Sequence, residues 1–177
     1  ASNNQGSIIL DDESAQKTGM YLGSMPFHFT STGSNFNKLT NNGSITIEKA
    51  NGYAYGMHSN VNYWQENNLS VINNGNITIN SSASSGSLYG IKISGSVPSS
   101  TTDLVVTNNG TITINNITSG MTAYGINLYD NATAFETITG SNNGKIVMNV
   151  TGGTAYGLYS SQGLDGQIGR ASCRERV

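Results

Sequence analysis

The sequence predicts an all-β protein, a parallel β-helix (solenoid) of about five coils, with a period of about 34 residues and three short strands per coil. Three observations lead to this fold class. A motif of the form Asn-Asn-Gly-x-Ile-x-Ile recurs along the chain, a Tyr-Gly motif keeps step with it, and Ile alternates with Thr inside the first motif, which is the period of a strand. Helical repeats have similar lengths, but the Gly, Asn, Thr and Ile that fill these motifs are poor helix formers.

The first motif predicts a turn followed by a strand. Its Ile residues are expected to point inward and its Thr residues outward. The Gly is expected to make the corner in a left-handed conformation, which it adopts without steric cost. The Asn amides are expected to bond to the same Asn one coil away, in ladders that stabilise stacked strands. The copies are Asn41-Asn42-Gly43, Asn73-Asn74-Gly75, Asn108-Asn109-Gly110 and Asn142-Asn143-Gly144.

The second motif predicts another strand in each coil. It places a Tyr and a Gly before Met, Ile or Leu, and Thr18-Gly19-Met20 takes its place in the first coil. The Tyr is two residues from the apolar side chain, so the two are expected to share a face of the strand, with the Gly on the other. Whether the Tyr lies inside the solenoid or at a corner stays open. Its copies, which we expect to form a structural ladder from coil to coil, are Tyr55, Tyr89, Tyr124 and Tyr156.

A third apolar patch precedes each later Asn-Asn-Gly and predicts the remaining strand of the coil. The pairs are Phe36 and Leu39, Leu69 and Val71, Leu104 and Val106, and Phe135 and Ile138. We therefore expect a single β-helix domain over residues 1–168. One coil cannot bury its own apolar face, so its stability has to come from neighbouring coils. The repeats start near Gly6, Gly43, Gly75, Gly110 and Gly144.

Residues 169–177 differ in composition from the rest of the chain. They hold all the arginines and the single cysteine, Cys173, which has no partner for an internal disulfide. We interpret them as a non-native tail that resembles translated vector or adaptor sequence, the alternative being a native basic tail. With that interpretation, we expect the protein to continue past Ile168.

The charge of the remaining chain argues against one class of partner. Residues 1–169 carry five Lys against nine Asp and Glu, a formal net charge of −4. A nucleic-acid-binding protein is expected to show a stripe of Lys and Arg, and the sequence has none. Nucleic acid is therefore excluded as an expected partner.

Residue types that carry catalysis or bind metals are sparse. The histidines, His28 and His58, are two in number, no Gly-x-Ser-x-Gly nucleophile elbow occurs, and no His/Cys cluster suits zinc. The densest acidic cluster is Asp11-Asp12-Glu13. Adjacent carboxylates on a strand end point apart, so we expect a solvated loop there rather than an acid/base pair or a calcium site.

One weaker acidic group remains open. Asp103, Asp130 and Glu136 would approach one another if the loops that carry them stack. We nevertheless predict that the protein is not an enzyme and that it uses no cofactor and no metal.

Two inserts hold most of the aromatic residues. They run from Tyr21 to Phe36 and from Tyr53 to Trp64. Exposed Tyr and Trp commonly stack on sugar rings or anchor protein contacts, which makes these loops candidate binding sites. The alternative is that they cap the open end of the first coils. The candidate binding residues are Phe27, Phe29, Tyr63 and Trp64.

The repeated Asn-Asn-Gly-x-Ile-x-Ile followed by Ala-Tyr-Gly-Ile resembles the passenger domains of bacterial autotransporters and related surface adhesins. The resemblance covers residues 3 to about 163. It implies a right-handed parallel β-helix on the bacterial cell surface. It also implies a longer chain that is secreted through a C-terminal outer-membrane β-barrel. The Gly-Asp-Ser-Gly-type motif of the serine-protease members is absent.

These expectations combine into one functional hypothesis with two alternatives. We expect a non-enzymatic, extracellular segment of an autotransporter-type adhesin, a stiff stalk that presents binding loops to a host glycan or to a matrix or cell-surface receptor. The first alternative is a fragment of a β-helix carbohydrate-active enzyme or phage tailspike. The second is self-association, in which open sheet edges stack head to tail into dimers or filaments.

Overall fold

The computed structural model describes residues 2–23, 37–62, 69–96, 103–128 and 137–160, and in these residues it confirms the predicted fold class. The described chain is all β, with three five-stranded sheets that we call A, B and C. Sheet A contains β1 (Ser2–Asn4), β4 (Asn37–Asn41), β7 (Leu69–Asn73), β10 (Asp103–Asn108) and β13 (Thr137–Asn142). Sheet B contains β2 (Ser7–Asp11), β5 (Ser44–Ala50), β8 (Asn76–Ser81), β11 (Thr111–Ile117) and β14 (Lys145–Val150). Sheet C contains β3 (Gln16–Leu22), β6 (Tyr53–Asn62), β9 (Gly86–Ser96), β12 (Met121–Leu128) and β15 (Thr154–Ser160).

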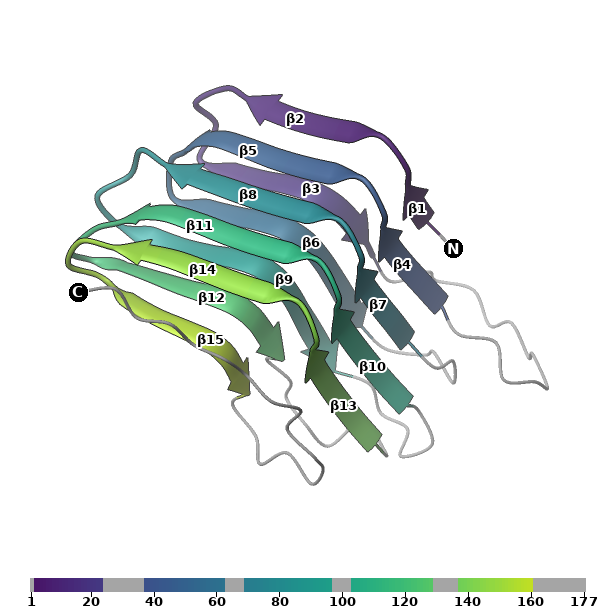
Figure 1. The fold of residues 1–177 in the computed structure, drawn as a ribbon. Helices are drawn as coiled ribbons and strands as arrows, with labels where there is room; N and C mark the ends of the chain where they lie inside the picture. The colour runs from purple at the N-terminus through teal and green to yellow at the C-terminus, as the bar shows by residue number, and fades with distance from the viewer. Residues whose placement is uncertain (1, 24–36, 63–68, 97–102, 129–136, 161–177) are drawn as a thin grey trace.

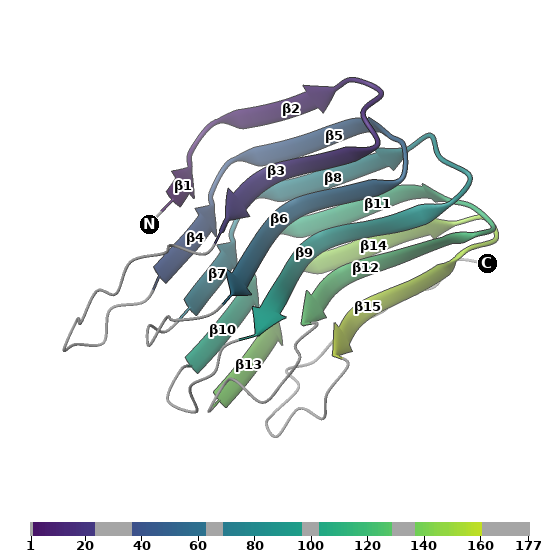
Figure 2. The ribbon, with the colours of Figure 1, turned by 180° about the vertical axis from the view of Figure 1, so that it is seen from behind.

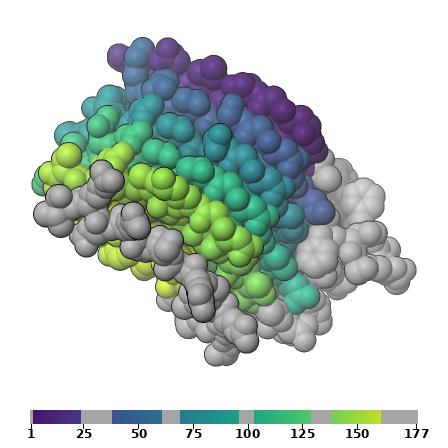
Figure 3. Space-filling model, in the orientation of Figure 1, coloured from purple at the N-terminus to yellow at the C-terminus, as the bar shows by residue number. Residues whose placement is uncertain are grey.

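Each coil passes through sheets A, B and C in that order, and the coils wind in a right-handed sense (Figures 1 and 2). This is the hand that connections between parallel strands of one sheet nearly always adopt. From β1 to β13 the chain makes four complete turns, and β14 and β15 follow. In the space-filling view successive coils form adjacent bands along the solenoid (Figure 3).

Equivalent residues of the repeats are register partners, so the repeat in sequence is a repeat in space. Ile45 of β5 pairs with Ile77 of β8, Ile77 pairs with Ile112 of β11, and Ile112 pairs with Ile146 of β14. Every strand pair in the three sheets is parallel. A structural perturbation at one position is therefore transmitted first to the same position in the next coil.

The hydrophobic core lies between the three sheets. The Ile residues of the first motif point into it and are fully buried in the middle coils, while the Thr residues between them lie on the outer face. Sheet A contributes Leu39, Val71 and Val106, and sheet C contributes Leu88 and Ile91. At the ends of the stack, Ile8 and Met148 are only partly buried because each coil there has one neighbour among the described strands.

The corner between sheets A and B differs from the expectation. None of the glycines at this corner has a positive φ, so the left-handed conformation predicted for them is wrong. Gly is required there because coils approach closely: a Cβ at Gly75 would overlap the carbonyl oxygen of Gly43 in the preceding coil. Four of the five described glycines with positive φ lie instead at the corner between sheets B and C, and they are Gly52, Gly86, Gly120 and Gly152. The fifth, Gly95, lies near the end of β9.

The faces of sheet C also differ from the expectation. A Cβ at Gly56 would lie 2.6 Å from the carbonyl oxygen of Gly90 and would clash with the core residue Ile77, so this Gly faces inward. Met57 is also in the core. In the register between β6 and β9, Tyr55 pairs with Tyr89 and Met57 pairs with Ile91, but the Gly between them has no register partner. The alternation therefore breaks at the Gly, as at a β-bulge, and Tyr55 faces outward. The prediction that the Tyr shares a face with the following apolar residue is wrong.

Several sequence predictions fall outside the described residues. These include the tail at 169–177 and the candidate binding residues Phe27, Phe29, Tyr63 and Trp64. The described residues contain no helix, and hence none that could cross a membrane.

Candidate functional site

The first Asn of each Asn-Asn-Gly motif belongs to a buried ladder at the end of sheet A. The Nδ2 of each Asn donates to the Oδ1 of the equivalent Asn in the next coil, at 2.6–2.8 Å. In three of the coils the same Nδ2 also reaches the carbonyl oxygen of the motif Gly two residues later, at 3.1–3.4 Å. In the middle coils, where Asn41, Asn73 and Asn108 are fully buried, these amides satisfy one another, so their hydrogen bonds hold the coils together. The members are Asn4, Asn41, Asn73, Asn108 and Asn142.

The second Asn of the motif forms an exposed ladder with the opposite polarity. Here the Nδ2 donates to the Oδ1 of the preceding coil, at 2.8–3.0 Å. Because this ladder is exposed to water, we expect each of its bonds to contribute less than a bond of the buried ladder. The members are Asn3, Asn42, Asn74, Asn109 and Asn143.

A third ladder follows the ends of the sheet B strands and was not predicted from the sequence. Asn149 donates to Asn115 at 2.5 Å, Asn115 donates to Asn80 at 2.6 Å, and Asn80 donates to the carboxylate of Glu48 at 2.8 Å. The sequence does contain a pattern that indicates this ladder, because Ile-Thr-Ile-Asn occurs twice, ending at Asn80 and at Asn115. In the preceding coil the carboxylate of Glu48 takes the position that the Asn amide has in the later coils.

The tyrosines of the second motif form a continuous stack on the outer face of sheet C. The ring centroids of Tyr55 and Tyr89 are 5.1 Å apart, those of Tyr89 and Tyr124 are 5.0 Å apart, and those of Tyr124 and Tyr156 are 5.3 Å apart. The rings of the first two pairs are inclined by only 5–6°. Offset stacking of this kind contributes about 0.5–1.5 kcal/mol per pair beyond area burial.

A second row of side chains packs along one flank of the tyrosine stack. The imidazole of His58 stacks on Tyr55 with centroids 4.7 Å apart, and its Nε2 lies 2.8 Å from the Oγ of Ser94. The Nζ of Lys92 lies 4.4 Å from the centroid of the Tyr89 ring, a cation–π contact. Burial, with the nearby charge of Lys92, lowers the pKa of His58 to about 4. Burial also lowers the pKa of Lys92.

The row continues to Asn127 and Tyr159, which follow Lys92 in register. The Oδ1 of Asn127 is buried and accepts no hydrogen bond. The ring of Tyr159 meets that of Tyr124 edge to face at 5.2 Å. Within this row Lys92 and Asn127 therefore lie side by side between the rings of His58 and Tyr159, and Asn127 is buried.

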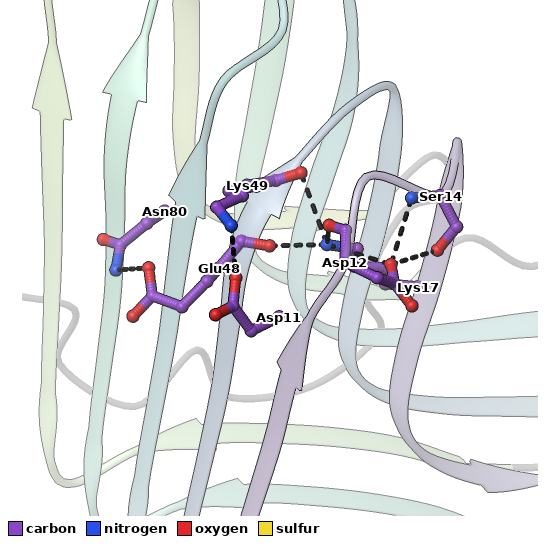
Figure 4. A network of polar contacts seen from close by, with 7 residues as sticks. All are labelled: Asp11, Asp12, Ser14, Lys17, Glu48, Lys49 and Asn80. Atoms are coloured by element: carbon purple, nitrogen blue, oxygen red, sulfur yellow. Dashed lines mark hydrogen bonds and ion pairs between the residues drawn. The ribbon is translucent and has the colours of Figure 1, made fainter.

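The acidic cluster of the first coil is tied to lysines (Figure 4). The carboxylate of Asp11 pairs with Lys49 at 3.0 Å. The carboxylate of Asp12 accepts hydrogen bonds from the backbone N–H and the Oγ of Ser14, at 3.0 and 2.5 Å, and lies 3.3 Å from the Nζ of Lys17. The hydrogen bonds from Ser14, with that from Lys17, lower the pKa of Asp12 to about 2.

Lys17 reaches this network from inside the solenoid. It pairs in register with the core residue Ala54, and its side chain is 2% exposed. Its Nζ donates to the carbonyl oxygens of Asp12, Glu48 and Lys49. A buried ammonium thus satisfies the carbonyl groups at the corner between sheets B and C, which is a structural role.

Catalytic groups do not converge in the part of the chain that the structure describes. His58 contacts Ser94, but none of the five strands of sheet C contains an Asp or Glu that would complete a triad. No cluster of three or more metal-ligating residues occurs among the described residues. Asp130, Glu136 and His28 lie outside them, so the proposed approach of Asp130 and Glu136 to Asp103 stays a prediction.

Comparison with known proteins adds no relative: no protein-family model, no curated protein and no solved structure matches the chain.

Proposed function

We propose that the protein is a non-enzymatic segment of a bacterial cell-surface adhesin of the autotransporter type. In this proposal the solenoid is a stiff stalk, and the segments that join sheet C to sheet A present binding groups to a host glycan or to a matrix or cell-surface receptor. The resemblance of the repeated motifs to autotransporter passengers suggests the surface location.

The observation that carries this proposal is the position of the long connections. The corner between sheets A and B takes two residues in the later coils, as between Asn41 and Ser44, and the corner between sheets B and C is also short. By contrast, residues 24–36, 63–68, 97–102 and 129–136 all join a strand of sheet C to a strand of sheet A. Solenoids generally bind through insertions on one face, and all four insertions here belong to one corner.

The stacked ladders support the mechanical part of the proposal. Two asparagine ladders and the tyrosine stack cross from coil to coil at positions that repeat with the strands. The asparagine ladders add side-chain hydrogen bonds, and the tyrosine stack adds ring contacts, to the backbone hydrogen bonds between neighbouring coils. A stack held at several corners resists bending, which suits a spacer between a cell and its target.

An array of glycans and matrix proteins, probed with the full chain, tests the proposal. Both retained protein and released sugar products are measured. We expect saturable retention without products, and loss of retention when Phe27, Phe29, Tyr63 and Trp64 are all changed to Ala. A circular dichroism spectrum equal to that of the wild type shows that the variant is folded.

Two results would contradict the proposal. Released oligosaccharides would show an enzyme of the β-helix carbohydrate-active type. Retention that is unchanged in the quadruple variant would place the binding groups outside these loops.

A further inference from the structure

The chain contains five Asn-Gly pairs, a dipeptide that is prone to react with itself. Because Gly has no side chain, its backbone nitrogen can approach the side-chain carbonyl carbon of the preceding Asn with little steric hindrance. Four of the pairs belong to the Asn-Asn-Gly motif, and the fifth is Asn51-Gly52. All five Asn residues are exposed to water, so exposure does not distinguish the pairs. Their hydrogen bonds do.

In the motif pairs, the groups that would react are held by neighbouring coils. The Nδ2 of Asn74 donates to Asn42 at 2.8 Å, and its Oδ1 accepts from Asn109 at 2.8 Å. The N–H of Gly75 donates to the carbonyl oxygen of Asn41 at 3.0 Å. Neither the amide nor the nitrogen that would attack it can turn toward the other until these bonds break.

The other motif pairs are held in related ways. In the two later coils the N–H of the motif Gly donates to the preceding coil at 2.9–3.0 Å. Gly43 makes no such bond with a described residue, but the side chain of Asn42 is held on both sides. It donates to Asn3 at 2.9 Å and accepts from Asn74 at 2.8 Å.

Asn51-Gly52 forms the corner between β5 and β6 and is not held in this way. Among the described residues, neither the side chain of Asn51 nor the N–H of Gly52 has a hydrogen-bond partner. The corner is fixed on its other atoms: the carbonyl oxygen of Gly52 accepts from the N–H of Ser87 at 3.1 Å, and the N–H of Tyr53 donates to Ala15 at 2.9 Å. The two groups that would react are therefore the ones that the neighbouring coils leave unbonded.

The corner does not require an Asn. Tyr53 is the register partner of Ser87, so the pair that takes the same place in the next coil is Ser85-Gly86. Serine has no side-chain carbonyl carbon and cannot undergo the reaction. The solenoid thus accepts a residue at this position that is inert.

We propose that Asn51-Gly52 is a site of spontaneous deamidation, from which the motif pairs are protected by their hydrogen bonds. The backbone nitrogen of Gly52, after losing its proton to base, attacks the side-chain carbonyl carbon of Asn51. The new C–N bond closes a succinimide ring, the bond to Nδ2 breaks, and ammonia leaves with the proton. Water then opens the ring at either of its carbonyl groups, which leaves aspartate or isoaspartate in place of the Asn.

The reaction changes a corner where coils meet. Either product adds a carboxylate two residues from Lys49, whose Nζ pairs with Asp11 at 3.0 Å (Figure 4). Isoaspartate also lengthens the main chain by a methylene group, next to the residue whose carbonyl oxygen accepts from Ser87. The site does not depend on where the protein is located or on what its loops bind, so it can be correct even if the proposed surface function is not.

The test incubates the full chain in mildly alkaline buffer and follows deamidation by tandem mass spectrometry of tryptic peptides. Cleavage after Lys49 and Lys92 gives one peptide that contains both Asn51 and Asn74, so the two sites share the same work-up. Digestion in heavy-oxygen water marks any deamidation that occurs during digestion. In the folded chain we expect Asn51 to react about tenfold faster than Asn74, because Asn74 must first break its hydrogen bonds. In urea, where the chain is unfolded, the two rates should be similar.

Two variants serve as matched controls. Asn42→Ala combined with Asn109→Ala removes both side-chain partners of Asn74 and should raise its rate several-fold while leaving that of Asn51 unchanged. A circular dichroism spectrum equal to that of the wild type shows that the double variant is folded. Asn51→Ser copies the pair Ser85-Gly86 and should remove the fast release of ammonia.

Three results would overturn the proposal. The first is an equal rate at Asn51 and Asn74 in the folded chain. The second is a difference that persists in urea, which would place its cause in the local sequence. The third is an unchanged rate at Asn74 in the folded double variant, which would show that the ladder does not protect it.

Discussion

A single methyl group at the corner between sheets A and B tests the close approach of the coils. Gly75 and Gly6 occupy equivalent positions in different coils. At Gly75 a Cβ would overlap the carbonyl oxygen of Gly43, whereas at Gly6 a Cβ would have no atom within 4 Å. Gly75→Ala and Gly6→Ala therefore add the same group in the same motif with opposite steric consequences.

The cost at Gly75 follows from the hydrogen bonds that the coils must give up. To relieve the overlap, the corner of this coil has to move away from the preceding one. The N–H of Gly75 donates to the carbonyl oxygen of Asn41 at 3.0 Å, and the N–H of Asn76 donates to that of Gly43 at 3.0 Å. Losing both bonds between packed coils, at about 1–2 kcal/mol each, amounts to about 3 kcal/mol.

Thermal and urea unfolding followed by circular dichroism measure the difference. We expect Gly75→Ala to lower the melting temperature by about 6–12 °C, from about 2–4 °C per kcal/mol for a chain of this size. Gly6→Ala is expected to stay within about 0.5 kcal/mol of the wild type. Hydrogen exchange should show faster exchange of the Asn76 amide in Gly75→Ala. If the two variants were equally stable, coil contact would not explain the glycine.

Three further predictions concern the ladders and the titratable groups. Asn73→Ala removes a buried amide bonded to Asn41 and Asn108 at 2.7 Å. It should lower the free energy of unfolding in urea by about 2–4 kcal/mol, against less than about 1 kcal/mol for the exposed Asn74→Ala; equal losses would contradict the division into buried and exposed ladders. The pKa of Asp12 is lowered to about 2, so the stabilisation it provides is present above pH 3.8 and is lost as the pH falls toward 2. Urea titrations should show this loss in the wild type and a weaker one in Asp12→Asn; equal slopes would count against the network. The pKa of His58 is lowered from 6.5 to about 4, so its neutral form stabilises the fold above pH 6.5, and this stability declines as the pH falls toward 4. An NMR titration of the imidazole should show a midpoint near 4, and a midpoint near 6.5 would refute the buried, stacked position.

The candidate sites could be predicted from the sequence only in part. The Asn of the Asn-Asn-Gly motif was assigned to ladders because identical residues one repeat apart must meet in a solenoid. The opposite polarity of the two ladders depends on the orientation of each amide, which the repeat does not encode. The ladder of tyrosines was also predicted, and their rings do stack from coil to coil. Its face was not predicted, because the motif places Tyr55 two residues from Met57, a spacing that puts both on one face of an unbroken strand.

The sequence by itself determined the fold class, the three strands per coil and the register, because a repeat of about 34 residues can bury its apolar pairs only by stacking on itself. The tertiary structure alone decided which way side chains face where the backbone departs from regular alternation. At Gly56 the core residue Ile77 and the carbonyl oxygen of Gly90 leave no room for a side chain, so the strand turns its Gly inward and its Tyr outward. That choice depends on atoms 21 and 34 residues away in sequence. It places the tyrosine stack on the outer face of sheet C, outside the cluster of inward-facing core residues, although Tyr55 and Tyr89 are themselves buried.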